Sequence, residues 1–345
     1  MSKIATVLHK IFGFAKRFGL DWFLLALIGM IVLAYFWPQI GAKDSVIPFS
    51  KIATYGVSVI FFFYGLRLSP QKLKTGLSNW RLHLVVQLAT FVLFPLLVIL
   101  AKSIIGSNGF DTIWVGVFFL ASLPGTVSSA VVMVSIAKGN IPSAIFNASI
   151  STLMGVFITP LWMGIYLNTS SVDMELGPVL LKLTLQVIFP VILGILLHPV
   201  WGFFAEKHGK KLRYFDQAII LLIVYTAFCE SFEKKIFEGY SALLLVGLGA
   251  AMIALFYAVY GIIYLTSKIL KFKYEDKITA LFCGSKKSLV HGTVMSNVLF
   301  AGSPYMGIVI LPIMMYHALQ LVMVSIIAQW MARGSEKGYP GNSPK

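Results

Sequence analysis

Long apolar stretches dominate the chain, and short polar segments separate them. A helix that crosses a bilayer needs about 20 apolar residues. Ten stretches approach this length, at about residues 21–40, 49–67, 82–103, 112–137, 142–167, 177–200, 213–231, 241–267, 278–301 and 304–332. The pattern therefore predicts an all-α polytopic membrane protein with ten transmembrane helices.

The distribution of charge predicts how these helices are oriented. Charged residues make up 12% of the chain and the mean hydropathy is +0.85, whereas soluble domains carry about 25% charged residues. Of the 28 lysines and arginines, 20 fall in the N-terminal segment, in alternate loops or in the C-terminal tail. Because cytoplasmic loops collect positive charge, we expect both termini in the cytoplasm. The net charge of +15 then needs no nucleic-acid partner, and a bacterial inner (cell) membrane is the expected location.

The two ends of the chain differ from the region between them. Residues 1–20 place apolar side chains on one helical face and basic ones elsewhere, which is typical of a helix lying in the membrane interface. Residues 333–345 are polar and rich in glycine and proline, so we expect a disordered tail.

The ten spans between these two ends divide into two five-helix halves, 21–167 and 168–332. Because five is odd, two similar halves would lie inverted in the membrane.

A weak internal similarity supports this division. An offset of 162 residues pairs Val132 and Met133 with Val294 and Met295, and it also pairs two prolines, Pro142 and Pro304. The matched stretches are the fourth span of each half and the turn that follows it. We therefore predict an inverted repeat.

The fourth and ninth spans are also interrupted. The segment SLPGTVSSA (122–130) places Pro124 and Gly125 inside the fourth span, and proline removes a backbone donor. The segment CGSKKSLVHG (283–292) brings two glycines and two lysines into the ninth span. Interruptions at corresponding positions of inverted halves indicate discontinuous helices that cross at a midplane binding site. The alternative is a pair of kinked helices packed in a bundle.

Lys286 and Lys287 lie deep in the ninth span. A lysine at the centre of a spanning helix costs about 2.5–3.5 kcal/mol on insertion-based scales, so these side chains should not face lipid. We expect at least one of them to line a cavity. For Lys286 the alternative is that it snorkels toward the cytoplasmic edge.

Four segments are similar to one transporter family: FFFYGLRLS (61–69), SLPGTVSSAVVM (122–133), AIFNASISTLMG (144–155) and FCGSKKSL (282–289). They resemble the bile acid:sodium symporter superfamily, most closely the branch of sodium/bile acid cotransporter 7 and its bacterial relatives. The resemblance implies two inverted five-helix repeats. Helices one, two, six and seven would form a panel, and helices four and nine would cross in a core. Family members take up organic anions, bile salts or smaller carboxylates, driven by sodium.

The resemblance also implies sodium ligands on the third, fourth and fifth spans: Gln87, Ser128, Ser129, Asn147 and Ser151. One departure concerns the family's glutamate in the ninth span, which contributes to both sodium sites. Lys287 aligns with it here. A sodium ion at this depth prefers oxygen ligands and compensating negative charge, and an ammonium group supplies neither.

Three mechanisms follow from this departure. In the first, Lys287 is neutral, and hydroxyl and carbonyl groups coordinate one sodium ion without a carboxylate; the groups belong to Thr126, Ser128, Ser129, Gln87 and Asn147. In the second, the ammonium of Lys287 replaces the ion, and coupling comes from protons or is absent. In the third, Lys287 contacts the anionic group of the substrate, and the same site includes Ser288, His291, Asn297 and Thr126.

We thus predict a secondary active transporter of small organic anions that works by alternating access. It would need no cofactor, with Na⁺ as a possible coupling ion, and its partners would be the substrate and the bilayer; a monomer is compatible with this function. The alternatives are a cation/proton antiporter or a non-transporting regulatory protein. An enzyme is the least favoured class, since the chain has no HExxH, no GxSxG and no close His/Asp cluster. The two cysteines, Cys229 and Cys283, lie in apolar surroundings and predict no disulfide.

Overall fold

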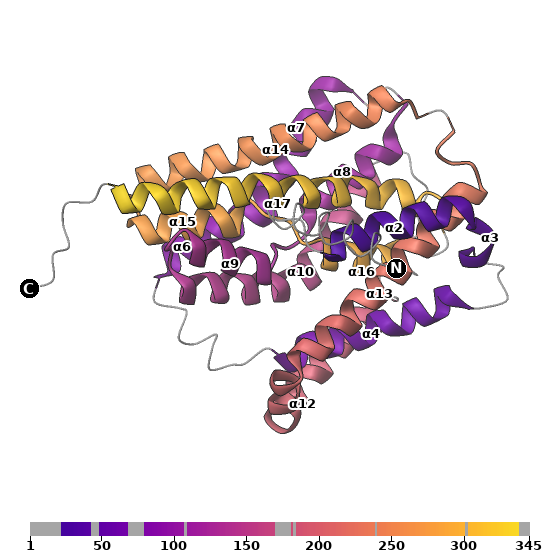
Figure 1. Cartoon of the computed structure of the whole chain (residues 1–345), viewed down its shortest axis with the longest axis horizontal. Helices are drawn as coiled ribbons and strands as arrows, with labels where there is room; N and C mark the ends of the chain where they lie inside the picture. Colours follow the sequence, from indigo (N-terminus) through magenta and orange to yellow (C-terminus); the bar gives the residue numbers. More distant parts are fainter. Residues whose placement is uncertain are drawn as a thin grey trace, which may run out of the picture.

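The computed structural model describes residues 22–42, 48–67, 79–106, 109–169, 181, 184–238, 240–300 and 303–337. Every regular element in these ranges is a helix (Figure 1). In chain order they are α2 (Trp22–Phe36), α3 (Pro38–Gly41), α4 (Phe49–Arg67), α6 (Trp80–Leu88), the π-helix η2 (Ala89–Leu93), α7 (Phe94–Ile105), α8 (Asp111–Ser122), α9 (Ser128–Ile136), α10 (Ile141–Thr169), the π-helix η3 (Thr184–Ile188), α12 (Phe189–Lys207), α13 (Gly209–Glu233), α14 (Ala242–Ile269), α15 (Tyr274–Gly284), α16 (Leu289–Leu299) and α17 (Met306–Lys337).

Seven helical segments of the described chain are long and apolar enough to cross a membrane. The chain is therefore a multi-pass, all-helical membrane protein. The other three predicted spans, 21–40, 112–137 and 278–301, each contain a break, so none forms one long rod. The predicted inverted repeat and the orientation of the termini stay predictions.

Both ends of the chain extend beyond the described residues. The interfacial segment predicted at 1–20 and the last part of the predicted tail, 338–345, lie outside the described ranges. Helix α17 continues to Lys337, five residues past the predicted end of the last span at 332. The first part of the predicted tail is therefore helical.

The first, second, sixth and seventh predicted spans pack on one another. Helix α12 runs along α4, and α13 packs against α2, α3 and α4 (Figure 1). Gly65 and Gly194 make the contact between α4 and α12 unusually close. A Cβ at Gly65 would overlap the carbonyl oxygen of Val191, and one at Gly194 would overlap that of Phe62. These four spans are the ones that the family resemblance assigns to a panel.

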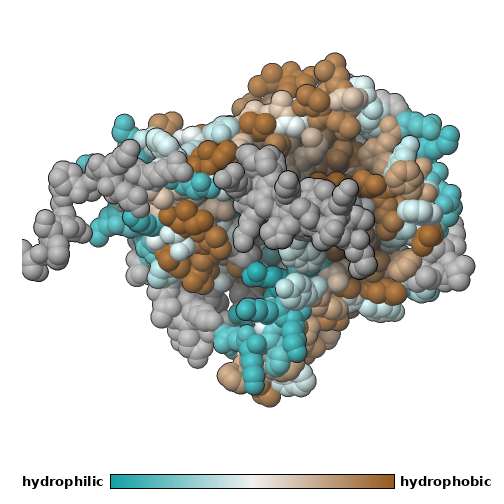
Figure 2. Space-filling view, viewed as in Figure 1, coloured by the Kyte–Doolittle hydropathy of each residue, from teal (hydrophilic) through white to brown (hydrophobic). Residues whose placement is uncertain are grey.

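The broken helices lie among the remaining elements. Helix α15 packs against α6, α9, α10 and α14, while α16 packs against α13 and α17. Helix α17 also contacts α8 and α9, so it runs beside both interruptions. The outer surface shows broad apolar areas, and hydrophilic side chains gather at the lower end of the view, toward the α12–α13 connection (Figure 2). Apolar outer surface is expected of helices that face lipid.

The π-helix η2 leaves two carbonyl oxygens without a helical partner. The N–H of Phe94 donates to the carbonyl of Ala89, five residues back. The next N–H would belong to Pro95, which has none. The carbonyl of Phe91 instead accepts from Trp162 Nε1 at 2.7 Å. The carbonyl of Thr90 is left for another donor, and this oxygen belongs to the site described next.

Candidate functional site at the crossing of two broken helices

The break in the fourth span runs from Leu123 to Val127. Two backbone groups at this break find partners outside helix α8. The carbonyl of Ser122 accepts from Thr159 Oγ1 at 2.7 Å, and the N–H of Gly125 donates to Ser151 Oγ at 3.0 Å. Both partners lie on α10. This fifth predicted span therefore holds the interruption open.

The break in the ninth span runs from Ser285 to Ser288. Helix α17 satisfies part of its backbone: Tyr316 donates its hydroxyl to the carbonyl of Ser285 at 2.7 Å. The amide of Gln320 accepts from the N–H of Lys287 at 2.9 Å and donates to the carbonyl of Lys287 at 2.8 Å. Two side chains of the tenth predicted span thus fix the unwound segment.

The two breaks touch each other, as the sequence predicts for crossing helices. The N–H of Ser288 donates to the carbonyl of Pro124 at 2.9 Å. A Cβ added at Gly125 would lie 3.2 Å from the carbonyl oxygen of Cys283, which is tighter than ordinary contact. Glycine at this position therefore allows the two backbones to approach closely.

The ammonium of Lys287 lies inside a cage of carbonyl oxygens. It donates to Thr90 and Ala121 at 2.6 Å each and to Leu123 at 2.8 Å, and it lies 4.2 Å from the centre of the Phe94 ring. The residue is 1% exposed. An ammonium group has three N–H donors, so all three are used.

Each carbonyl oxygen of the cage lacks an N–H donor within its own helix, and in each case the reason is local. In a continuous helix the N–H of Gly125 would donate to the carbonyl of Ala121, but here it donates to Ser151 Oγ instead. Leu123 follows the last residue of α8. Thr90 lacks its partner because of Pro95. The cage thus combines the carboxyl end of a half-helix, which favours a cation, with one carbonyl released by proline.

Lys286 points to a different place. Its side chain is fully buried, and its Nζ donates to Ser129 Oγ at 2.8 Å. The hydroxyl of Ser129 donates in turn to Thr126 Oγ1 at 3.0 Å. The snorkelling alternative for Lys286 is wrong, because the chain path around the break turns this side chain toward α9 instead of the membrane edge.

The side chains predicted as sodium ligands contact one another or the breaks. Gln87 Nε2 donates to both the carbonyl and the Oδ1 of Asn147, at 3.2 Å each. Ser151 accepts from Gly125 and Ser129 accepts from Lys286. The side chain of Ser128 lies outside the described part of the structure. The described ligands therefore already have protein partners, while Gln87 Oε1 is buried with none among the described atoms.

The residues predicted for the substrate lie on different walls of the crossing. Ser288 caps α16 and its hydroxyl lies 2.8 Å from His291 Nδ1. The ring of His291 packs on Tyr64 with 5.0 Å between ring centres, and Asn297 Oδ1 accepts from Thr54 Oγ1 at 3.3 Å. His291 and Asn297 therefore face α4, whereas Lys287 faces η2 and α8.

Sequence reasoning missed Tyr316 and Gln320 as parts of this site. The tenth span carried a usable signal, because a glutamine deep in an apolar helix needs a hydrogen-bond partner. It also missed the backbone of Thr90. The Phe-Pro pair at 94–95 marks where a carbonyl is released, but the sequence does not say which side chain reaches it.

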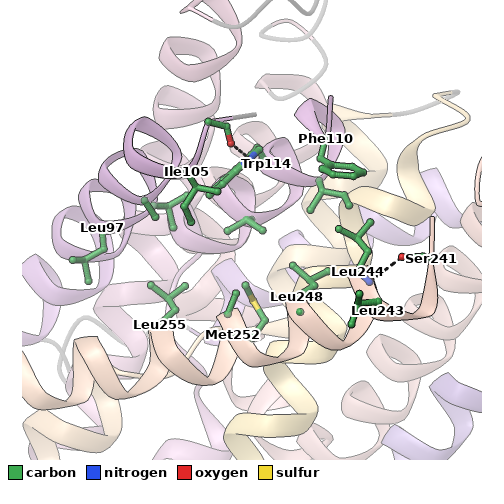
Figure 3. A pocket seen from close by; sticks show the side chains of 17 residues that line it. Leu97, Ile105, Phe110, Trp114, Ser241, Leu243, Leu244, Leu248, Met252 and Leu255 are labelled. Atoms are coloured by element: carbon green, nitrogen blue, oxygen red, sulfur yellow. Dashed lines mark hydrogen bonds between the residues drawn. The ribbon is translucent and has the colours of Figure 1, made fainter. Parts of the chain in front are cut away.

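A separate cavity of about 530 Å³ lies between α7, α8 and α14 (Figure 3). Its walls are apolar residues such as Leu97, Trp114 and Leu248, and none of the lining residues is charged. Ser241 caps α14 by accepting from the N–H of Leu244 at 3.2 Å. Such a cavity offers nothing to bind an anion, so the candidate site is the crossing.

A bundle of spanning helices in which two discontinuous helices cross, with ionisable side chains at the crossing, defines a class: membrane proteins built like secondary transporters. The particular family follows from the sequence. Residues 21–333 match the SBF-like CPA transporter family (DUF4137), and the chain belongs to this family. It is therefore a transporter-family protein and not an enzyme, and the resemblance to the bile acid:sodium symporters is confirmed.

Relatives match almost the whole chain. An uncharacterized protein of Pseudomonas aeruginosa is 38% identical, over 92% of this chain and 94% of the relative. The Escherichia coli protein named "Putative symporter YfeH" is 36% identical, over 92% and 95%. Sodium/bile acid cotransporter 7-B of Xenopus laevis is 29% identical, also over 92% and 95%.

Proposed function

We propose that this protein is a secondary active transporter of small organic anions, working by alternating access around the crossing of α8–α9 with α15–α16. The family supports a transporter, and the names of two relatives describe a symporter and a bile acid cotransporter. Two buried ammonium groups at the crossing favour an anion over a cation as the substrate. The proposal includes two inverted five-helix repeats, both termini in the cytoplasm, and a location in the cell membrane.

One observation supports the coupling mechanism: the ammonium of Lys287 occupies a position with three carbonyl oxygens at 2.6–2.8 Å. This is the environment that a desolvated cation requires. The alignment with the family's ligand glutamate gives the same position. We infer that Lys287 is a built-in cation, so that transport does not depend on a sodium ion there. Coupling then comes from protons or is absent. The third mechanism is disfavoured, because Lys287 has no N–H left for a substrate.

Sodium symport at another point of the crossing is the second candidate. The cotransporter name of one relative supports it, and so does the buried, unpartnered Oε1 of Gln87 beside Asn147. An oxygen without a donor is a ligand that a cation could use. This candidate keeps the ligands of the third and fifth spans and does not use Lys287.

Uptake into proteoliposomes tests the proposal. Radiolabelled taurocholate and a panel of short mono- and dicarboxylates are offered to the purified protein, with sodium replaced by choline at constant pH and with pH gradients imposed separately. We expect saturable uptake of at least one anion, unchanged by the replacement of sodium. Protein-free liposomes are the control, and Lys287→Glu should gain a sodium response.

Other results would point elsewhere. Uptake that disappears without sodium and ignores pH would refute the built-in cation and favour symport near Gln87. Absence of uptake for every anion, together with cation–proton exchange, would favour an antiporter. Currents that do not saturate would favour a channel.

A further inference from the structure

The two adjacent lysines differ in how their charges are satisfied. Lys287 makes three hydrogen bonds to backbone oxygens, and all of these residues are fully buried. Lys286 makes one, to a side-chain hydroxyl on Ser129. Two of its three N–H donors therefore lack a partner among the described residues. A buried ammonium with a single neutral partner is costly, because neither its charge nor its donors are compensated.

The surroundings of Lys286 add positive potential. Ser129 lies in the first turn of α9, which starts at Ser128. The first turn of a helix presents unpaired N–H groups and the positive end of the helix dipole. In the described part of the chain no carboxylate forms an ion pair with Lys286. An ammonium group and a helix N-terminus thus converge without a counter-ion, and an anion would balance both.

Both lysines are fully buried, but the hydrogen-bond partner of Lys286 is more exposed than the partners of Lys287. This partner, Ser129, is half-buried, and the preceding Val127 is 44% exposed. The cage around Lys287, by contrast, is closed by residues that are fully buried. The hydroxyl of Ser129 is not one of the oxygens that bind Lys287, so a ligand that displaces it from Lys286 leaves the cage intact.

We propose that Lys286 is the residue that binds the anionic group of the transported substrate, a carboxylate or a sulfonate, which replaces Ser129 as its partner. Lys287 then stabilises the fold, and Lys286 recognises the substrate. This assignment rests on the proposed function as an anion transporter. It adds a specificity-determining residue to that function.

Transport kinetics give the first test. We expect Lys286→Met to raise the apparent KM for taurocholate, or for whichever panel anion the wild type takes up, about 10-fold or more, because a hydrogen bond to a charged group is lost. Lys286→Arg should retain most of the affinity. Lys277→Met removes one positive charge from α15, the helix that precedes the break, and should leave the apparent KM unchanged.

Cysteine protection gives a second readout that does not require transport. Lys286→Cys, in a protein with both native cysteines replaced, is treated with an anionic methanethiosulfonate reagent. We expect modification that taurocholate or sulfate slows. Protection that fails to appear, together with an unchanged apparent KM in Lys286→Met, overturns the proposal. So does a Lys286→Met protein in which only the pH profile changes, since that result would assign proton carriage to Lys286.

The proposed function and the assignment of Lys286 can be refuted separately. A wild-type protein that takes up no anion refutes the proposed function. A wild-type protein that transports normally and is insensitive to substitution at Lys286 refutes this inference alone. If Lys286→Met does not yield a monodisperse protein, the comparison of Lys286→Arg with wild type and the cysteine experiment decide the question.

Discussion

The Nζ atom of Lys287 lies 2.6 Å from the carbonyl oxygen of Ala121, so a side chain of the ninth predicted span closes the end of a half-helix in the fourth. The same ammonium reaches Thr90 on the third span at 2.6 Å. Cations stabilise the carboxyl ends of helices, and here the helix ends inside the protein. The charge of Lys287 therefore joins three spans that would otherwise present unpaired carbonyls to one another.

Removing this charge should destabilise the protein. Lys287→Met keeps much of the side-chain length but leaves three buried carbonyls without a donor, at about 1–3 kcal/mol each. We expect a clearly lower midpoint of thermal unfolding for the protein purified in detergent. Lys277→Met on α15, the helix that precedes the break, is the matched control. Equal midpoints for the two variants would contradict the role of the cage.

The emptied cage should accept an inorganic cation. In Lys287→Ala the oxygens of Thr90, Ala121 and Leu123 have no ammonium between them, and a site that binds only the folded state raises its stability. We expect sodium chloride, compared with choline chloride at equal ionic strength, to raise the midpoint of thermal unfolding of Lys287→Ala. The same replacement should not affect the wild type. A variant that is indifferent to sodium would show that the cage collapses when emptied.

Gln320 should contribute to stability through the backbone of the ninth span. Gln320→Leu removes one acceptor and one donor from Lys287, and each lost bond leaves a buried backbone group unpaired, at about 1–3 kcal/mol. The control is Gln329→Leu on the same helix, where the exposed glutamine donates to Ser325 Oγ at 3.3 Å and to no other described residue. We expect the free energy of unfolding to fall for position 320 and to change little for position 329.

The close contact between α4 and α12 should depend on glycine. Gly65→Ala forces a methyl group onto the carbonyl oxygen of Val191, and backbone atoms cannot move aside cheaply. A methyl group added at Gly164 on α10 would meet no described residue within 4 Å, so Gly164→Ala should be neutral or stabilising by up to about 1 kcal/mol. Gel filtration and thermal unfolding of both variants check this expectation. A stable Gly65→Ala protein would contradict the packing.

The orientation predicted from the lysines and arginines can be tested on two exposed turns. Lys235 and Lys271 both adopt left-handed backbone conformations, with φ of 54° and 53°, at the ends of helical regions. In a protein with both native cysteines replaced, Lys235→Cys should react with an impermeant maleimide on intact cells. Lys271→Cys should react only after permeabilisation. The opposite labelling pattern would reverse the predicted topology.

The sequence predicted most of the architecture because lipid imposes simple rules. Helix length and apolar composition predicted an all-helical membrane protein, and Pro124 marked one of the two breaks. The arrangement of the site was less predictable. Lys286 and Lys287 are chemically identical side chains at adjacent positions of one span. The backbone of the break nevertheless directs Lys286 toward Ser129 and Lys287 toward Ala121. Such a difference depends on the tertiary path of the break.

The length of one side chain also limits how this protein can move. Lys287 is covalently part of the ninth span and is anchored by its tip to the third and fourth, so these spans cannot separate by more than an aliphatic tether permits. Any cycle that opens the molecule first to one side and then to the other must carry the tethered spans together as a single body. The surface at which this body moves against the rest of the protein must then lie along α4 and α13. There Tyr64 and Thr54 of α4 contact α16 through a ring contact and one long hydrogen bond.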